Sequence, residues 1–213
     1  MKKIIFLLIV TLSVIEGSFA QQDTGKYIRK GLIRSMATIS PGIMLNGIMS
    51  NTSTIFIHGN LEYYVADNVS IRGDSYYFLQ AKDNDGCNPF EYNHSTFSGA
   101  SYHFKTKNHF DPYLTLEPGI SITKRSAAFE EPKPCVLYGM SKTAANPLLS
   151  SAIGFNFYFQ KLFHLFGEAR YIIGKNISGD SEYPVGNSSA RLSLNELRFS
   201  FGLGFNINVL KKK

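Results

Sequence analysis

The chain has 213 residues, of which 44% are hydrophobic and 18% charged, and its formal net charge is +6 at pH 7. This length suits one domain of moderate size or one small barrel. The basic excess would suit a nucleic-acid-binding protein, but the lysines are scattered through predicted turns and tails, which argues against a nucleic-acid partner. After residue 20 no apolar stretch is long enough for a transmembrane helix, so a membrane-embedded form of this chain would have to be a closed β-barrel.

Residues 1–20 have the pattern of a secretory signal peptide. Lys2 and Lys3 form a basic start, residues 4–15 are an almost unbroken apolar run, and residues 18–20 are suited to the cleavage positions. We therefore expect export and cleavage before Gln21. The alternative, an uncleaved membrane anchor, is disfavoured because the apolar run is shorter than the ~20 residues that a spanning helix needs.

Downstream of a polar lead-in at residues 21–30, apolar and polar side chains alternate with a period of two in eight segments. Such alternation predicts β-strands with one apolar and one polar face. The predicted strands cover residues 32–45, 54–65, 69–80, 95–105, 113–123, 148–160, 165–173 and 195–209. Pro41 interrupts the first strand, and we expect it at a bulge or at a lipid-facing kink.

The alternation is clearest in the last strand, from Asn195 to Val209. From Leu197 onward every odd position carries a bulky apolar side chain, whereas the even positions carry Arg198 and otherwise Ser, Gly or Asn. On a soluble sheet we would expect Lys, Glu and Thr opposite the core face. The observed pattern instead fits a strand with lipid outside the barrel and a narrow wet lumen inside.

The predicted connections differ in length. Those after the second, fourth and sixth strands are short, whereas those after the third, fifth and seventh are the long polar segments 81–93, 124–146 and 174–193. Transmembrane barrels show this asymmetry, with tight periplasmic turns and longer extracellular loops. Both ends of the barrel segment would then lie on the periplasmic side.

Charged side chains within the predicted strands all fall on the polar face. Four are arginines and five are acidic, and the only lysine of these strands is Lys105, at the very end of the fourth. The arginines and acids are Arg34, Glu62, Arg72, Asp74, Glu117, Glu168, Arg170, Glu196 and Arg198. A narrow, partly dehydrated interior favours arginines paired with carboxylates, so we predict an ion-pair network in the lumen.

The alternative fold is a soluble eight-stranded barrel or sandwich whose bulky face forms the core. An eight-stranded barrel has room for only one layer of interior side chains or one small ligand. All the Phe, Leu and Ile residues of the apolar faces would overfill that space, whereas Gly, Ser, Asn and a few ion pairs would fill it. The volume therefore favours the transmembrane barrel.

Cys87 and Cys135 lie in the predicted loops after the third and fifth strands, on the same side of the barrel. In an exported protein a disulfide between these loops is the first expectation. Two free thiols are the alternative. A metal site is disfavoured, since only His94 is near in sequence.

Catalytic residues are weakly indicated. His94 and Ser95, at the predicted outer rim, are the one candidate for lipid-modifying chemistry, but no spacing signature supports them. Glu117 and Glu168 could form a catalytic carboxylate pair, yet the arginines on the same face favour structural ion pairs. We therefore expect no enzyme activity, no metal and no cofactor.

With the signal, the strands and the closing segment in place, residues 31–210 resemble the small eight-stranded outer-membrane β-barrel family of Gram-negative bacteria, of the OmpA-barrel, OmpX and OmpW type. The best local match is the barrel-assembly signal of the last strand, with Ser200, Gly202, Phe205 and Ile207 at its positions. The chain departs from the usual form because it continues beyond the final aromatic residue to a basic tail at residues 211–213. Its Asn-, Lys- and Ile-rich composition would suit a Bacteroidetes-like source.

The resemblance implies an all-β fold, an antiparallel up-and-down transmembrane β-barrel in the bacterial outer membrane. It also implies contact with outer-membrane lipid, insertion by the barrel-assembly machinery and a monomeric state. We expect a non-enzymatic protein that supports envelope integrity or presents its extracellular loops to surface partners. Two alternatives stay open: a narrow channel for small or apolar solutes, as the OmpW resemblance would imply, and a lipid-modifying enzyme at the rim.

Overall fold

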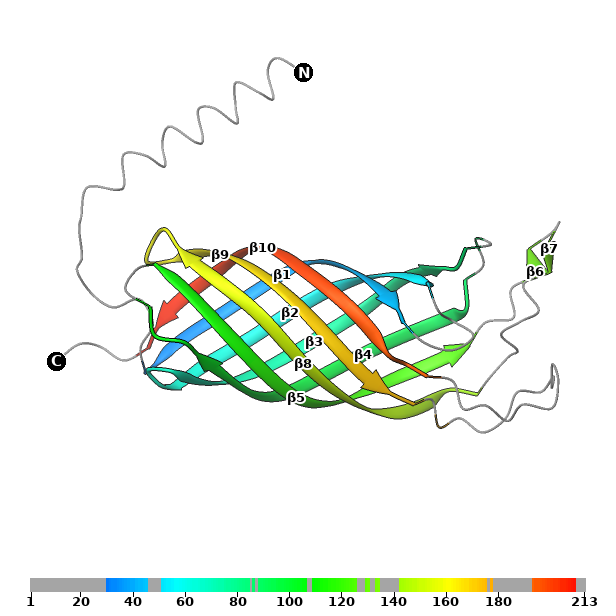
Figure 1. The fold of residues 1–213 in the computed structure, drawn as a ribbon, viewed down its shortest axis with the longest axis horizontal. Coiled ribbons are helices and arrows are strands. Elements are labelled where there is room, and N and C mark those ends of the chain that lie inside the picture. The colour runs from blue at the N-terminus through cyan, green and yellow to red at the C-terminus, as the bar shows by residue number, and fades with distance from the viewer. Residues whose placement is uncertain are drawn as a thin grey trace, which may run out of the picture.

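The computed structural model describes residues 30–45, 51–84, 86, 88–106, 109–125, 129–130, 133–134, 142–175, 177 and 193–209. Within these ranges eight antiparallel strands close into a barrel, in the order β1-β10-β9-β8-β5-β4-β3-β2 (Figure 1). Strands that follow one another along the chain are neighbours in the barrel, so the topology is up-and-down. The predicted fold class is confirmed. Among the described residues, no helix is long and apolar enough to cross a membrane.

The barrel strands are 12 to 16 residues long. They are β1 (Leu32–Met44), β2 (Ser53–Ala66), β3 (Val69–Lys82), β4 (Phe90–His103), β5 (Phe110–Arg125), β8 (Ala144–Tyr158), β9 (Phe163–Gly174) and β10 (Glu196–Asn208). A separate two-stranded hairpin, β6 (Phe129–Glu130) and β7 (Lys133–Pro134), lies within the segment that joins β5 to β8. The eight barrel strands match the eight predicted segments, whereas the hairpin was not predicted.

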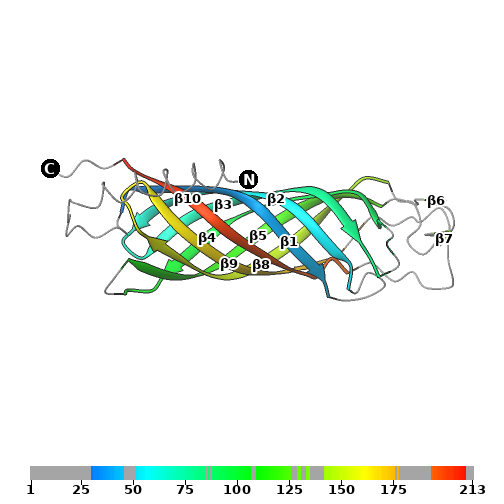
Figure 2. The same cartoon turned by 90° about the horizontal axis from the view of Figure 1, so that it is seen from above.

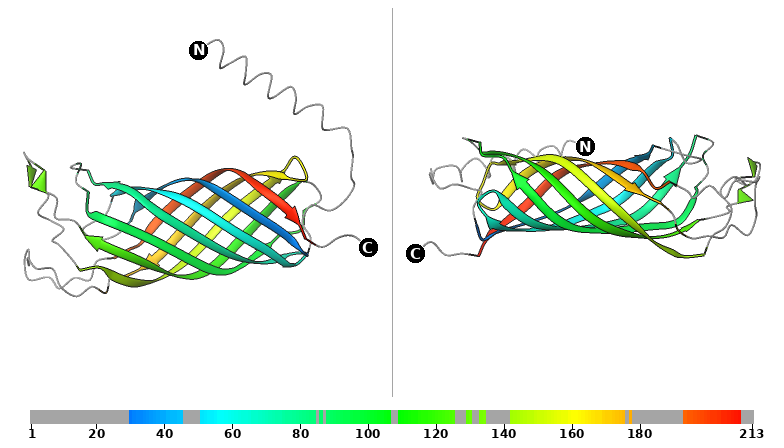
Figure 3. Two further views of the ribbon diagram at one scale, coloured as in Figure 1. Left: turned by 180° about the vertical axis from the view of Figure 1, so that it is seen from behind. Right: turned by 60° about the horizontal axis from the view of Figure 1, so that its bottom comes forward.

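The two ends of the barrel differ in their connections. Figure 2 shows the short β2–β3, β4–β5 and β8–β9 turns at one end, where β1 also begins and β10 finishes, and we call this the turn end. β1, β3, β5 and β9 all finish at the opposite end, which we call the loop end (Figure 3). Leu32 of β1 pairs with Asn208 of β10, and this contact closes the barrel at the turn end.

β4 and β8 extend further beyond their predicted loop-end limits than the other strands do. β4 begins at Phe90, before the predicted start at residue 95, and a register shift between Phe90 and Tyr92 disturbs its pairing with β5. An irregularity of this kind moves the period-two pattern out of phase, which is why alternation did not reveal the start of the strand. β8 begins at Ala144, and Pro147 near its start lacks the N–H that a ladder bond requires.

Pro41 lies on the exposed face of β1. The β1–β2 register runs through Pro41 without a shift, and the β1–β10 register is the same on both sides of it. Of the two positions expected for Pro41, the structure therefore supports the lipid-facing one and not the bulge. The hydroxyl of Ser40 donates to the carbonyl of Phe199 at 2.8 Å, so a side chain bonds the β10 backbone beside the proline.

Bulky apolar side chains lie outside the barrel and charged side chains lie inside it. In β10, Phe201 is 67% exposed whereas Arg198 is only 2% exposed. Phe199 and Phe205 of the same strand are also exposed. A soluble barrel would have the opposite orientation, so that alternative is wrong. A continuous apolar exterior of this kind is the surface of a barrel that faces lipid.

The interior also contains an apolar cluster that the alternation did not predict. It occupies the loop-end half of the barrel, and rings of Phe56, Tyr76, Phe78 and Phe90 meet edge to face at centroid distances of 5.8 to 6.1 Å. The buried members are Met44, Phe56, Tyr76, Phe78, Ala81, Phe90, Phe97, Leu148, Ile172 and Leu194. Edge-to-face contacts add to the stabilisation from burying these rings. The loop-end interior is thus packed like a protein core.

If the exterior faces hydrocarbon, an arginine in the middle of β10 should be more harmful than one near its end. We predict that Phe201→Arg destabilises the barrel by about 2–4 kcal/mol and that Ile207→Arg costs only about 0–1 kcal/mol, because the penalty depends on depth in the bilayer. Urea unfolding in lipid vesicles measures both. Equal effects of the two substitutions would contradict the lipid-facing orientation.

Candidate functional site

Four arginines from four strands lie one beyond another inside the barrel. They are Arg34 of β1, Arg72 of β3, Arg170 of β9 and Arg198 of β10, and all are buried. We call them the arginine column. Arg34 lies nearest the turn end and Arg198 nearest the loop end, as their positions along the strands require. The column follows from the alternation, because each arginine is on the inward face of its strand.

Aromatic rings separate the arginines of the column in two places. The ring of Tyr113 lies between the guanidinium groups of Arg34 and Arg72, at 5.3 and 5.6 Å from its centroid. The ring of Tyr76 lies between Arg170 and Arg198, at 5.7 and 4.5 Å. Cation–π attraction stabilises such contacts, more strongly when water is excluded. The rings therefore fill the space between like charges and attract both.

Two carboxylates hold the middle of the column. Asp74 accepts from Arg72 at 2.6 and 2.7 Å and lies 3.1 Å from Arg170. Glu168 lies 2.6 Å from Arg72 and 3.1 Å from the Nε of Arg170, and the hydroxyl of Tyr113 donates to it at 2.9 Å. Each acid thus contacts both arginines. These four side chains form a closed set of ion pairs, in which the Arg72–Asp74 and Arg170–Glu168 contacts are charge-assisted hydrogen bonds, the strong class of hydrogen bond.

The remaining predicted acids each pair with one arginine of the column. Glu196 accepts from Arg198 at 2.7 and 3.0 Å, and Ser95 accepts from the same guanidinium at 2.8 Å. Glu117 forms an ion pair with Arg170, and Glu62 forms one with Arg34. All nine charged residues singled out in the sequence therefore lie in the interior, and each has an oppositely charged partner.

At the turn end, His103 bridges two carboxylates. Its Nε2 is 3.0 Å from Glu62, and its Nδ1 is 2.9 Å from Asp111. Only the protonated imidazole donates from both nitrogens, so this geometry fits a cationic His103. Tyr64 and Tyr158 each donate to Asp111 at 3.2 Å. Their rings help to fill the interior at this level.

Asp111 and the interior histidines were not among the predicted site residues. Asp111 lies two residues before the predicted start of the fifth strand, whereas the structure includes it in β5 and buries it. A signal was present, because residues 111, 113, 115 and 117 continue the inward phase of that strand. The contacts of His103 could not be read from the sequence, since its partners come from two other strands.

Ser200, His58 and Asp74 make the contacts of a hydrolase triad. His58 Nδ1 is 2.9 Å from the Ser200 hydroxyl, and His58 Nε2 is 2.6 Å from Asp74. All three side chains are buried within the interior packing, and the Asp74 carboxylate is already bound by two arginines. A nucleophile has to reach its substrate, so the burial makes these contacts structural.

His94 and Ser95, the candidate catalytic pair at the rim, do not contact each other through their side chains. Ser95 lies inside the barrel, against Arg198, whereas His94 lies on the outer side of the same strand. The ring of His94 stacks on Tyr77 at 4.4 Å, and its Nδ1 accepts from the backbone N–H of Phe78 at 3.1 Å. Adjacent residues of a strand point to opposite faces, so the sheet wall separates this histidine from this hydroxyl.

The other predicted sites have mixed outcomes. Cys87 and Cys135 lie outside the described residues. The four residues of the predicted assembly signal lie in β10, with Ser200 buried inside and Phe205 and Ile207 exposed outside. The signal itself stays a prediction. The carboxylates of Glu117 and Glu168 both contact Arg170, which is the ion-pair alternative.

Glycines make room for the interior rings. A Cβ at Gly154 would overlap the ring of Tyr113, and a Cβ at Gly119 would overlap the ring of Phe97. In both cases the glycine is the direct cross-strand partner of the aromatic residue. Glycine in a strand often marks a close approach of another group. These glycines thus allow large rings in a narrow lumen.

The backbone resembles several solved outer-membrane barrels. The outer membrane protein OprG from Pseudomonas aeruginosa matches with a TM-score of 0.55 at 11% identity, over 85% of this chain and 98% of that chain. The N-terminal β-barrel domain of Pseudomonas aeruginosa OprF matches with a TM-score of 0.51 at 13% identity, over 84% of this chain and 99% of that chain. Ail, the attachment invasion locus protein of Yersinia pestis, in complex with the heparin analogue sucrose octasulfate, has a TM-score of 0.51 at 10% identity, with coverages of 84% and 99%.

No family model matches the sequence, and no curated protein matches it either. The likeness to the solved structures therefore concerns the fold. The chain has the fold of the small eight-stranded outer-membrane β-barrels.

The central ion pairs should dominate the stability of the interior. We predict that Asp74→Asn destabilises the barrel by about 3–5 kcal/mol, because it leaves buried guanidinium groups without their carboxylate. Glu91→Gln is the matched control, since Glu91 forms an exposed pair with Lys124 and such pairs contribute little. Urea titration in vesicles compares the two. A similar loss in both variants would contradict a network held by its central acids.

The glycine positions allow a second matched comparison. Gly154→Ala should destabilise the barrel by about 1–3 kcal/mol, because the added methyl group overlaps a ring held between two arginines. Gly59→Ala is the control, since nothing lies within 4 Å of a Cβ at that position. The unfolding midpoints in urea measure the difference. Unchanged stability of Gly154→Ala would mean that Tyr113 is not fixed in this position.

Proposed function

We propose that this protein is a non-enzymatic, integral outer-membrane β-barrel with a closed interior. Its role would be to support the envelope or to present its loop-end segments to partners outside the cell. The observation that carries this proposal is the filled interior.

Side chains fill the interior at three levels. At the turn end, Tyr64 and Tyr158 converge on Asp111. In the middle, Arg72 and Arg170 form ion pairs with Asp74 and Glu168. At the loop end, the apolar cluster closes the space. A water-filled channel needs an open polar path, and three packed levels favour a barrel that acts through its wall and its loops.

The loop-end segments are the candidates for contact with partners. Residues 126–143 join β5 to β8, and residues 175–195 join β9 to β10, and these are the longest connections of the barrel. Loops on a rigid scaffold commonly carry the binding residues of a protein. Ail was solved with a heparin analogue, which shows that one barrel of this fold binds an external ligand. We extend only the general idea of external binding to this chain.

The proposal also covers how the protein reaches its place. Residues 1–20 would act as the export signal, and the last strand would be read by the barrel-assembly machinery, giving a monomer in the outer membrane. The cysteines would form the disulfide between loops. These parts lie outside the described residues, except for the last strand.

Electrical recording tests the closed state. We predict that the purified protein gives no steady conductance in planar bilayers, because the column and the apolar cluster fill the lumen. Phe199→Ala, which changes only the exterior, should behave like the wild type. A steady wild-type conductance that Arg170→Ala widens would contradict the proposal and favour the narrow channel.

The non-enzymatic part has its own test. Incubation with phospholipid or lipid A should leave both lipids chemically unchanged when products are followed by mass spectrometry. Lipid alteration by the wild type that is lost in His94→Ala would establish a rim enzyme and overturn this part of the proposal.

A further inference from the structure

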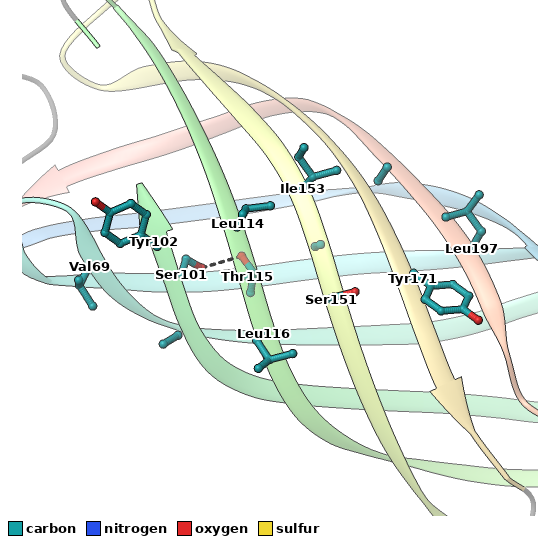
Figure 4. Close-up of a pocket in the computed structure, with 13 residues that line it drawn as sticks. Val69, Ser101, Tyr102, Leu114, Thr115, Leu116, Ser151, Ile153, Tyr171 and Leu197 are labelled. Carbon is teal, nitrogen blue, oxygen red and sulfur yellow. Dashed lines mark hydrogen bonds between the residues drawn. The ribbon is translucent and has the colours of Figure 1, made fainter. Parts of the chain in front are cut away.

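The outer wall carries a groove that crosses most of the barrel. It has a volume of about 730 Å³, within the range of ~300–1,000 Å³ that is usual for small-molecule sites. Figure 4 shows its side chains spread from Val69 and Tyr102 at one side to Tyr171 and Leu197 at the other. The walls are apolar and point outward, as the 62% exposure of Ile153 shows.

Small side chains form the floor of this groove. Two outward-facing cross-strand rows line it, on either side of the row Ser101, Thr115 and Ala152, whose side chains are buried and which also lines the groove. In the first, Tyr102 pairs with Leu114, Leu114 with Ile153, and Ile153 with Ala169. In the second, Ala100 pairs with Leu116, Leu116 with Ser151, Ser151 with Tyr171, and Tyr171 with Leu197. Ala100, Ser151 and Ala169 are shorter than their neighbours in the rows, and the wall is hollow above them.

The direction and length of the groove fit an acyl chain. It crosses from β3 to β10, and neighbouring strands lie ~4.8 Å apart, so it is about 24 Å long. Strands of such barrels tilt by ~40°, and the rows run across the strands, so the groove rises by roughly 15 Å along the membrane normal. This height equals about one leaflet of the hydrocarbon core. The groove therefore offers one lipid chain a continuous contact across its leaflet.

The groove starts at the turn end. Val69 is the first residue of β3, and Tyr102 is next to the last residue of β4. Tyr102 packs edge to face on Phe104 at 5.3 Å, and aromatic residues of this kind sit at the level of lipid headgroups. Lys105, in the turn beyond them, is exposed. A cation at this level attracts the phosphate of a lipid headgroup.

We propose that this groove is a binding site for one phospholipid of the turn-end leaflet, with an acyl chain over Ala100, Ser151 and Ala169 and the phosphate near Lys105. This inference depends on the proposed membrane location and adds a specific ligand to it. Acyl chains surround the exterior of a lipid-facing barrel, so a lipid is the molecule available to occupy the groove. By contrast, bulky side chains stand on the wall at Phe199, Phe201 and Phe205 of β10.

Native mass spectrometry tests the site. The protein is refolded into vesicles of phosphatidylethanolamine and phosphatidylglycerol, extracted in mild detergent and weighed. We expect the wild type to retain one phospholipid. Ala169→Phe, which fills the floor, should lower retention at least about tenfold, because displacing two buried methylenes is worth that factor. Ala37→Phe is the matched control, since Ala37 is exposed on β1, which does not line the groove, and it should retain lipid like the wild type.

Folding is checked by the shift between unboiled and boiled samples on gels, and Ser151→Leu replaces Ala169→Phe if the latter fails this check. Equal lipid retention by the wild type and a folded groove variant would overturn the inference. A folded wild type without bound phospholipid would overturn it too, while the membrane barrel would stand. Dimers that disappear in Ala169→Phe would show that a second protein copy occupies the groove, which also contradicts the lipid site. Failure of the wild type to insert into vesicles would instead contradict the proposed function.

Discussion

The structure depends on the cost of exposing a charge to hydrocarbon. An arginine at the middle of a bilayer is unfavourable by several kcal/mol, so the charged side chains of the strands have to face inward. The interior is too narrow to hydrate them fully, and a buried charge needs partners. Asp74 and Glu168 meet this need by contacting Arg72 and Arg170 together. The cost of exposing charge to hydrocarbon therefore determines both which face of each strand points inward and that the inward charges are paired.

The same requirement determines how the lumen is filled. Arginine side chains are long, and Tyr113 and Tyr76 occupy the space between successive guanidinium groups of the column. The ring of Tyr113 fits because the opposite strand has no side chain at Gly154. Toward the loop end the charges give way to Phe56, Phe78 and Phe90. The proposed function follows from this packed interior, because it leaves the wall and the loops as the accessible surfaces of the barrel.

Alternation in the sequence was sufficient to predict the strand count, the fold class and the faces of the charged residues, because side-chain direction in a strand has a period of exactly two residues and needs only local information. The alternation did not reveal the start of β4, because its phase changes at the irregularity between Phe90 and Tyr92. The predicted start of the fifth strand was also too late, so Asp111 was not recognised as an interior residue. Alternation could not predict contacts such as His58 with Ser200, which are 142 residues apart, because these depend on the stagger of the closed barrel. The apolar cluster was missed because aromatic residues suit either face.

The orientation of β10 is the central claim, and spin labelling along this strand in lipid bilayers tests it most directly. Cys87 and Cys135 are first replaced by Ser, and single cysteines are then introduced in turn at residues 199–206. Each cysteine is labelled with a nitroxide. The collision rates of the nitroxide with oxygen and with a water-soluble nickel chelate are measured. The account predicts that labels at 199, 201, 203 and 205 are accessible to oxygen dissolved in the lipid, and that labels at the even positions are shielded from it. Odd positions shielded from oxygen, with even positions open to the nickel chelate, would contradict the account.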